Sequence, residues 1–358
     1  FGASTRNGGF VDASLTHGLA NGVRRWPEEI GELVRLGRAN LDGLLADIDR
    51  LAIDCGLTAS GELDVARTDW QVEELAESAE LYDRHGIRAD LLDRDGVQAR
   101  LRSPRFLAGL HRPDDVVLVD PARLAQALRD AAEAAGVTIH EGSPVTAVEA
   151  RGTGLALSTP AGRVHANRAV VATNAYAGPV GRTRRWIVPV YDHVLVTEPL
   201  DTEQRAAIGW AGREGAGDTA HRFHYYRLTD DDRVLWGGFE PTYHRGNGLD
   251  PAFDQDEPMH LRLARNFFDT FPQLEGLRFS HRWGGPIATT SSFTATWGTA
   301  HDGRVVWVGG YTGLGVGASR FGAATALDLV DGLATERTGL AMVRRKPVPF
   351  PPEPLRSL

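Results

Sequence analysis

The stretch from 305 to 333 constrains the fold more than any other part of this sequence. It opens with the β-branched and aromatic run 305–308, passes five glycines between 309 and 317, and continues from 320 in an Ala- and Leu-rich helical pattern. This pattern predicts a buried strand, a tight glycine turn and a helix. A helix start has unpaired N–H groups and a partial positive charge, so it suits an anionic or electron-rich ligand group. A packing corner between strand and helix would give the same pattern.

A βαβ-like unit is predicted between 120 and 173. Its elements are a helix at 122–135, strands at 137–140 and 144–149, a hairpin at 152–165 and a buried strand at 168–173. This alternation favours an α/β domain. Ligands of open α/β sheets bind at the carboxyl ends of strands. We therefore expect the turns at 2–9, 172–178 and 309–317 to converge on one crevice that holds a large, partly anionic cofactor.

The rest of the chain has a different pattern. Strands of an antiparallel sheet are expected at 190–197, 223–228, 234–239 and 279–284, with a strand pair within 107–119. Helices are expected at 26–54, 69–85, 93–101 and 258–271. The predicted fold is therefore mixed α/β, with two interleaved domains. The α/β domain comprises 1–22, 105–185 and 285–335, the sheet domain comprises 23–104 and 186–284, and a Pro-rich extended tail covers 336–358.

Composition and missing motifs exclude several classes of function. A net charge of −8 over 358 residues gives no support for nucleic-acid binding. No apolar run approaches the roughly 18–20 residues that span a bilayer, and no signal-peptide pattern occurs, so a cytoplasmic location is the default expectation. The single Cys55 excludes an internal disulfide, and no HxxxH or HExxH spacing favours a metal site. The phosphate loop GxxxxGK(S/T), a GxGxxG that opens a βαβ unit and the GxSxG elbow are also absent, which disfavours NTP hydrolysis, NAD-dependent dehydrogenation and serine hydrolysis.

Five segments, taken in order, carry a family resemblance. They are GASTRNGG at 2–9, VVATNAY at 170–176, YYRLT at 225–229 with WGG at 236–238, FPQL at 271–274 running to RWGG at 282–285, and GYTGLGV at 310–316. The set resembles the FAD-dependent oxidoreductases of the D-amino-acid oxidase superfamily, which include glycine and sarcosine oxidases. Within it, the segments are most similar to the gamma-glutamylputrescine oxidoreductase group.

The resemblance implies a Rossmann-like FAD-binding domain interleaved with an antiparallel substrate-binding domain. Relatives begin with a strand, a GxGxxG turn and a helix, whereas this chain opens at Phe1, inside the next loop. We therefore expect the first βαβ unit to precede Phe1 in a longer protein; the alternative is a truncated, cofactor-free and non-catalytic fragment. No counterpart of the Cys or His that attaches flavin covalently in some relatives is present, so non-covalent FAD is expected.

The resemblance also assigns cofactor-binding residues. Ser4, Arg6, Asn7, Gly8 and Gly9 would line the flavin and its ribityl chain, Val145 the adenine, Ala172 and Asn174 the pyrophosphate, and Gly310, Gly313, Leu314, Gly315 and Val316 the N1–C2=O edge of the flavin ring. Leu314 stands where relatives often have histidine. A surface loop, a core valine and strand-end packing are the alternative interpretations for the first three groups.

The substrate face is expected to include Tyr225, Tyr226, Arg227, Trp283 and Tyr311. The catalytic candidates are Tyr226, Arg282, Trp283 and Tyr311. Tyr and Trp offer an apolar wall with one polar group, although only one of Tyr225 and Tyr226 can point into a pocket from a strand. Arg282 would suit a substrate carboxylate, and an internal salt bridge would explain it equally well.

The implied reaction is hydride transfer from the carbon that bears the amine to flavin N5, which gives an imine that water hydrolyses. The expected partners are a small-molecule amine or amino acid and either O₂ or an electron carrier, with no nucleic acid and no membrane span.

Overall fold

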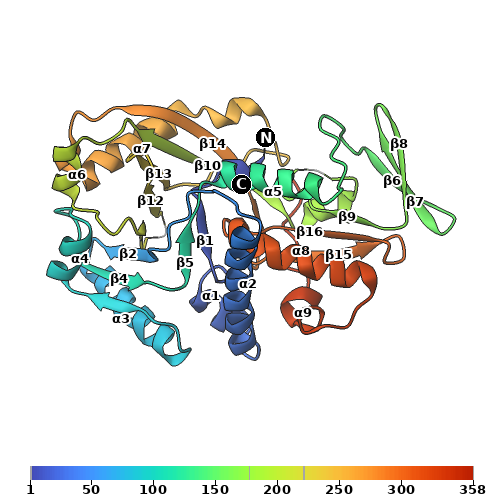
Figure 1. The fold of residues 1–358 in the computed structure, drawn as a ribbon, viewed down its shortest axis with the longest axis horizontal. Helices are drawn as coiled ribbons and strands as arrows, with labels where there is room; N and C mark the ends of the chain where they lie inside the picture. Colours follow the sequence, from blue (N-terminus) through green and yellow to red (C-terminus); the bar gives the residue numbers. More distant parts are fainter. Residues whose placement is uncertain (1, 177, 221, 358) are drawn as a thin grey trace.

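The computed structural model describes residues 2–176, 178–220 and 222–357 (Figure 1). A large sheet with its helices forms one end of the elongated molecule, a small hairpin sheet forms the other, and α2 and α8 lie between them. Within the described residues, no helix is both long and apolar enough to cross a membrane.

The largest sheet has eight strands in the order β14-β10-β13-β12-β11-β2-β4-β3. Their bounds are β2 Glu62–Ala66, β3 Asp90–Leu92, β4 Ala108–Arg112, β10 Val188–Thr197, β11 Gly215–Asp218, β12 His224–Leu228, β13 Val234–Gly238 and β14 Phe279–Thr289. All neighbours pair antiparallel except β11 with β2. The antiparallel strands predicted from 190 to 284 are present, and β14 runs five residues past the predicted end.

Helices cover one face of this sheet, and the other face is directed toward the N-terminal loop. The covering helices are α4 Arg94–Arg100, α6 Thr202–Ile208 and α7 Glu257–Thr270. Trp236 of β13 and Phe267 of α7 are fully buried in the core between them. Asp256 caps α7 by accepting a hydrogen bond from the Met259 amide, and Pro258 fits the first turn because its missing N–H needs no partner there.

The central part is built around two long helices and two small sheets. It contains β1 Phe10–Asp12 paired with β5 Val116–Leu118, the three-stranded sheet β15 Thr296–Ala300, β16 Val305–Gly309 and β9 Ala169–Val171, and helices α1 Leu19–Arg25, α2 Ile30–Arg50, α8 Gly315–Asp331, α9 Glu336–Gly339 and α10 Ala341–Arg344. Leu33 and Leu36 of α2 share a core with Phe321 of α8. Because of this packing, we propose to group α2 with the α/β part; the remaining division into domains stays a prediction.

Within the described residues, the remaining elements are two helices, four 3₁₀ turns and a hairpin sheet. They are α3 Asp69–Arg84, α5 Pro121–Ala134, the 3₁₀ turns η1 Ala3–Thr5, η2 Gly181–Arg185, η3 Pro251–Asp254 and η4 Pro272–Leu274, and the hairpin sheet β6 Ala147–Arg151, β7 Gly154–Thr159 and β8 Gly162–Ala166. The predicted helices at 69–85, 93–101 and 122–135 and the hairpin agree with the structure within two residues.

Two element predictions are right only in part and two are wrong. The helix expected from 26 to 54 is the shorter α2, preceded by the separate α1. The strands within 107–119 do not pair with each other, since β4 joins the large sheet and β5 joins β1. Residues 137–140 form no strand, and 53% of the Val137 surface is exposed, because no described strand lies beside them. The strand at 168–173 is the three-residue β9, and Val170 in it is 40% exposed rather than buried.

Candidate functional site

Two of the three glycine-bearing turns meet through a single side chain. Asn174 follows β9 with a positive φ of 49°, and its Oδ1 accepts a hydrogen bond of 2.9 Å from the Gly310 amide. A Cβ on Gly309 would lie 3.2 Å from the Asn174 Cα, so the turns are also in close backbone contact. The expected convergence of the turns at 172–178 and 309–317 is therefore present in the structure.

The turn from 310 to 313 is held against the end of β14. Thr312 donates its backbone N–H to Ala288 at 2.9 Å, and its hydroxyl donates to the Gly310 carbonyl at 3.1 Å. Gly310 has a φ of +78°, and a Cβ there would come within 2.3 Å of the Thr290 methyl group. Gly313 also has a positive φ but faces open space, so the turn is rigid at its base and uncovered at its tip.

Helix α8 begins at this uncovered tip. Leu314 is its N-cap and provides no side-chain hydrogen bond to the first turn. Gly317 packs against β1, since a Cβ there would lie 2.6 Å from the Asp12 carbonyl oxygen. The start of α8 is therefore set directly beside the strand that follows the 2–9 loop, with its positive end and first N–H groups uncapped.

The 2–9 loop is closed by the side chain of Asn7. The Asn7 amide donates to the Ala3 and Ser4 carbonyls at 3.0 and 3.1 Å, and its oxygen accepts from the Gly9 amide at 2.9 Å. Gly8 lies on the Tyr225 ring, because a Cβ would come within 2.7 Å of that ring. These contacts fix the loop against the large sheet and leave the Ser4 side chain exposed.

Arg6 and Trp283 join the loop to β14. The Arg6 guanidinium forms an ion pair with Asp254 of η3 and donates to the Gly284 carbonyl at 3.3 Å. The Trp283 indole N–H donates to the Arg6 carbonyl at 2.9 Å. Asp254 carries no signal of its role in the sequence, because it is 248 residues from Arg6 and lies in no recognisable motif.

The structure separates the two adjacent tyrosines of β12. Tyr226 is only 1% exposed and stacks on Trp236 inside the core, with ring centroids 4.8 Å apart. Tyr225 is on the opposite face beneath the loop, and its hydroxyl donates to Asp192 at 2.8 Å. Burial, together with the neighbouring Asp192 carboxylate, raises the pKa of Tyr225 well above its ordinary value. Tyr225, and not Tyr226, therefore faces the site.

Other expected site residues lie apart from this surface. Arg282 is exposed on the helix-covered side of the sheet, beside His260. The Tyr311 ring packs beneath α8 where Gly322 leaves room, and burial raises the pKa of its hydroxyl. Val145 precedes β6 with an exposed side chain, and Ala172 is exposed just before Asn174.

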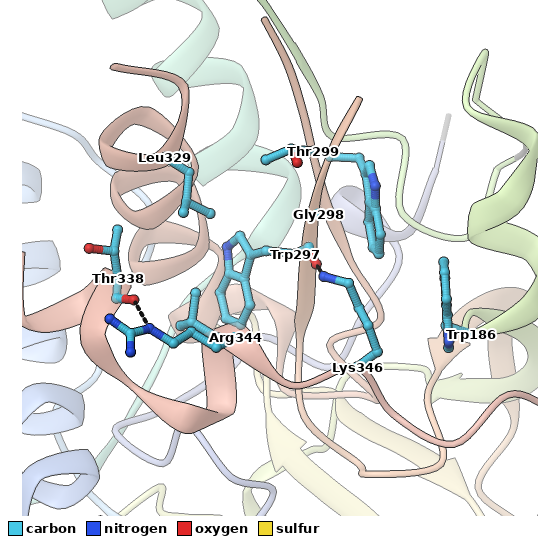
Figure 2. Close-up of a pocket in the computed structure, with 10 residues that line it drawn as sticks. Trp186, Trp297, Gly298, Thr299, Leu329, Thr338, Arg344 and Lys346 are labelled. Atoms are coloured by element: carbon cyan, nitrogen blue, oxygen red, sulfur yellow. Dashed lines mark hydrogen bonds between the residues drawn. The ribbon is translucent and has the colours of Figure 1, made fainter. Parts of the chain in front are cut away.

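A separate pocket of about 260 Å³ lies beside β15, α9 and α10 (Figure 2). Trp186, Trp297 and Trp307 line it, and the Lys346 ammonium lies 5.0 Å from the centre of the Trp307 ring. Lys346 also donates to the Trp297 carbonyl (Figure 2). None of the residues that line this pocket belongs to the three glycine-bearing turns.

Replacing Asn174 by alanine is expected to loosen the junction of the two turns. The variant would lose the acceptor of the Gly310 amide and would place alanine at a positive φ, so we expect the unfolding free energy to fall by about 1–3 kcal/mol. Chemical denaturation measures this change. Asn174→Asp keeps the acceptor and tolerates positive φ, so it should restore most of the loss; equal losses in both variants would contradict the role of this hydrogen bond.

The chain is similar to known proteins over most of its length. A family model described as "FAD dependent oxidoreductase" matches residues 1–329. Gamma-glutamylputrescine oxidoreductase from Escherichia coli is 29% identical over 357 residues, which cover 98% of this chain and 80% of that protein. A D-amino acid dehydrogenase from Sinorhizobium medicae is 27% identical over 350 residues, with coverages of 93% and 80%. The crystal structure of glycine oxidase from Geobacillus kaustophilus superposes with a TM-score of 0.77 at 20% identity, over 94% of this chain and 86% of that one. This likeness confirms the expected mixed α/β fold.

Proposed function

This chain belongs to the family of FAD-dependent oxidoreductases, and from that premise we propose that it oxidises the C–N bond of an amine or amino acid. The family match confirms the resemblance found in the sequence and makes FAD the cofactor. The observation that carries the proposal is the junction of the Asn174 and Gly310 turns beside the uncapped start of α8.

The described residues fit an aromatic, electron-rich cofactor edge at this junction. Gly313 leaves open space where a side chain would stand, and the first turn of α8 offers N–H groups that no side chain caps. The positive end of a 17-residue helix favours negative charge placed there. We propose that Gly310, Gly313, Leu314, Gly315 and Val316 hold the pyrimidine edge of the flavin, and that Ala172 and Asn174 lie beside its pyrophosphate.

The loop from 4 to 9 would form the next wall of the cofactor site. Gly8 and Gly9 present backbone there and Ser4 an exposed side chain, whereas the Asn7 side chain is fully used in closing the loop. The Arg6 guanidinium is tied to Asp254 and Gly284, so we propose that it positions this loop on the substrate-binding sheet. Val145 remains a proposed adenine contact through its backbone.

Tyr225 and Trp283 would supply the substrate wall. Each already uses its polar group, Tyr225 on Asp192 and Trp283 on Arg6, so what each would offer a bound molecule is apolar ring surface. Gly8 and Gly237 lie against the Tyr225 ring, so only the part of that ring that they leave uncovered would take part. A bound flavin would supply the acceptor for a hydride equivalent from the substrate carbon next to nitrogen. The chain's own part is to fix that carbon, to shield it from water and to keep its nitrogen neutral. Relatives named for oxidation of gamma-glutamylputrescine, glycine and D-amino acids support a small nitrogenous substrate.

Flavin reduction tests this function. Purified protein is supplied with FAD, gel-filtered and mixed without oxygen with a panel of amines and amino acids. We expect the protein to retain yellow flavin and one substrate class to bleach it. Readmitted O₂ or an added dye acceptor then shows which of them reoxidises the flavin. Protein that stays colourless with added FAD would support the alternative, a non-catalytic fragment, and retained flavin that no amine bleaches would contradict the proposed reaction.

A further inference from the structure

We infer that Asp192 binds the ammonium group of the substrate and accepts its proton before oxidation. This inference rests on the proposed amine oxidation and adds to it the substrate class, an amine whose reacting carbon bears no carboxylate. Three features carry it: the face of the sheet on which Asp192 lies, the groups that hold its carboxylate, and the lack of a cation paired with it.

Asp192 lies on the same sheet face as Tyr225 and Trp283. Along β10 it is two residues from Val194, and Val194 pairs with Gly237 and Trp283 in the neighbouring strands. Gly237 pairs in turn with Tyr225. Since directly paired residues and residues two apart share a face, all of these residues face the 4–9 loop. The adjacent His193 points to the other face, where its Nε2 N–H donates to the Phe253 carbonyl at 3.0 Å.

The Asp192 carboxylate is held in place from one side. The Tyr225 ring lies across Gly237, where a Cβ would come within 2.5 Å of it, and this flat placement brings the hydroxyl to Asp192 Oδ2 at 2.8 Å. Backbone N–H groups at His193 and Gly238 also interact favourably with the carboxylate. The Asp192 residue is nevertheless only half-buried, so part of its surface stays open to a ligand.

Within the described residues, no arginine, lysine or histidine lies within ion-pair distance of the Asp192 carboxylate, and His193, whose ring lies on the opposite face, is the basic neighbour whose charge lowers the pKa of Asp192. Arg6 of the facing loop is already paired with Asp254 of η3. A carboxylate in such a place needs a positive partner, because removal from water disfavours an unpaired charge. A substrate ammonium group meets that need, whereas a carboxylate next to the reacting carbon would be repelled.

The proton transfer balances without another reactant. An alkyl ammonium has a pKa of about 10 and is charged at neutral pH, yet only the neutral amine has the lone pair that assists hydride loss. The N–H bond breaks, the O–H bond of the Asp192 carboxylic acid forms, and the electron pair stays on nitrogen. Burial raises the pKa of Asp192, against the opposing hydrogen bond from Tyr225, which makes its carboxylate a better proton acceptor.

Substitution of Asp192 by asparagine tests the inference in two ways. With a simple diamine such as 1,4-diaminobutane, kcat/KM at pH 7 should fall roughly 100-fold. The loss should shrink as pH rises toward the pKa of the free amine, because neutral substrate then no longer needs a base. The dissociation constant of tert-butylamine, which has no hydrogen on its amine carbon, should rise at least about tenfold in calorimetry, a readout independent of turnover. Asp328→Asn is the control, because it alters a buried carboxylate that pairs with Arg337 far from the loop. This variant should change neither kcat/KM nor the dissociation constant of tert-butylamine.

The outcomes separate this inference from the proposed function. Wild-type flavin that no amine bleaches would defeat the function itself. Wild-type flavin that is bleached, with an Asp192→Asn variant of unchanged pH profile and unchanged tert-butylamine affinity, would overturn the inference alone. If the asparagine variant does not fold, Tyr225→Phe serves instead. Loss of its hydrogen bond should move the acidic limb of the wild-type pH profile upward, and an unmoved limb would overturn the inference.

Discussion

Replacement of Arg112 by methionine is expected to lower the free energy of unfolding by about 3–5 kcal/mol at neutral pH. Arg112 of β4 is 6% exposed, forms an ion pair with Glu62 and lies 3.4 Å from Asp12 and 3.9 Å from Asp64. Its guanidinium also lies over the Tyr82 ring, 5.4 Å from the ring centre. Methionine keeps most of the packing but leaves three carboxylates without their shared cation.

The size of this loss should depend on pH. One guanidinium cannot neutralise three carboxylates, and burial raises the pKa of Glu62 from 4.5 to about 8. A carboxyl with a raised pKa stabilises the fold fully below its unfolded pKa of about 4.5, and this stability disappears as pH rises toward 8. Without Arg112, ionisation of the Glu62 carboxyl becomes still less favourable. The variant should therefore lose more unfolding free energy at pH 8 than at pH 5.

Urea denaturation at pH 5 and pH 8 measures both effects. Arg129→Met is the matched control, because Arg129 pairs with Asp130 on the exposed surface of α5 and should leave stability nearly unchanged. If the Arg112→Met protein were as stable as the wild type at pH 8, then something other than Arg112, for example water, would stabilise the three carboxylates.

Replacement of Gly9 by alanine is the second change with a large expected effect. Gly9 has a φ of +78°, and a Cβ there would lie 2.0 Å from the Val119 carbonyl oxygen, which is a steric clash. Gly9 also donates to Asn7 and accepts from the Val119 amide, so the backbone cannot turn away without breaking the loop. We expect a loss of on the order of 3 kcal/mol in unfolding free energy and at least tenfold weaker FAD binding.

Thermal unfolding and flavin titration measure these two losses. Gly18→Ala is the matched control, because Gly18 has a φ of +86° but no atom within 4 Å of the added Cβ. It carries the same backbone penalty without the clash and without contact with the proposed site. If both variants bound FAD like the wild type, the 4–9 loop would not be a wall of the cofactor site.

The local sequence pattern was enough to predict those elements whose own residues mark their type and their ends. Helix α7 has an acidic cap, a proline in its first turn and apolar residues at helical spacing, and it agrees with its predicted bounds within one residue. Residues 137–140 have strand composition but need a neighbour for their backbone hydrogen bonds, and composition cannot provide that neighbour. The strand pair within 107–119 failed for the same reason, since the partners of β4 and β5 lie far away in sequence.

The direction of single side chains in the candidate site also depends on residues that are far away in the sequence. Alternation along β12 predicts that Tyr225 and Tyr226 face opposite sides, but which side is the core depends on α7, more than 30 residues later. Arg282 and Trp283 alternate in the same way on β14, and only Trp283 reaches the loop. The glycine turns were located correctly because positive φ and close backbone approach demand glycine locally.

The Tyr225 ring lying across Gly237 links two paired positions on the neighbouring strands β12 and β13. Any side chain at 237 would occupy the place of the ring, since its Cβ alone would come within 2.5 Å of the ring carbon that carries the hydroxyl. A larger residue at 237 is therefore acceptable only together with a smaller one at 225. The two positions should covary during evolution as one unit, and drift at either is restricted by the other even though each lies in a separate short motif.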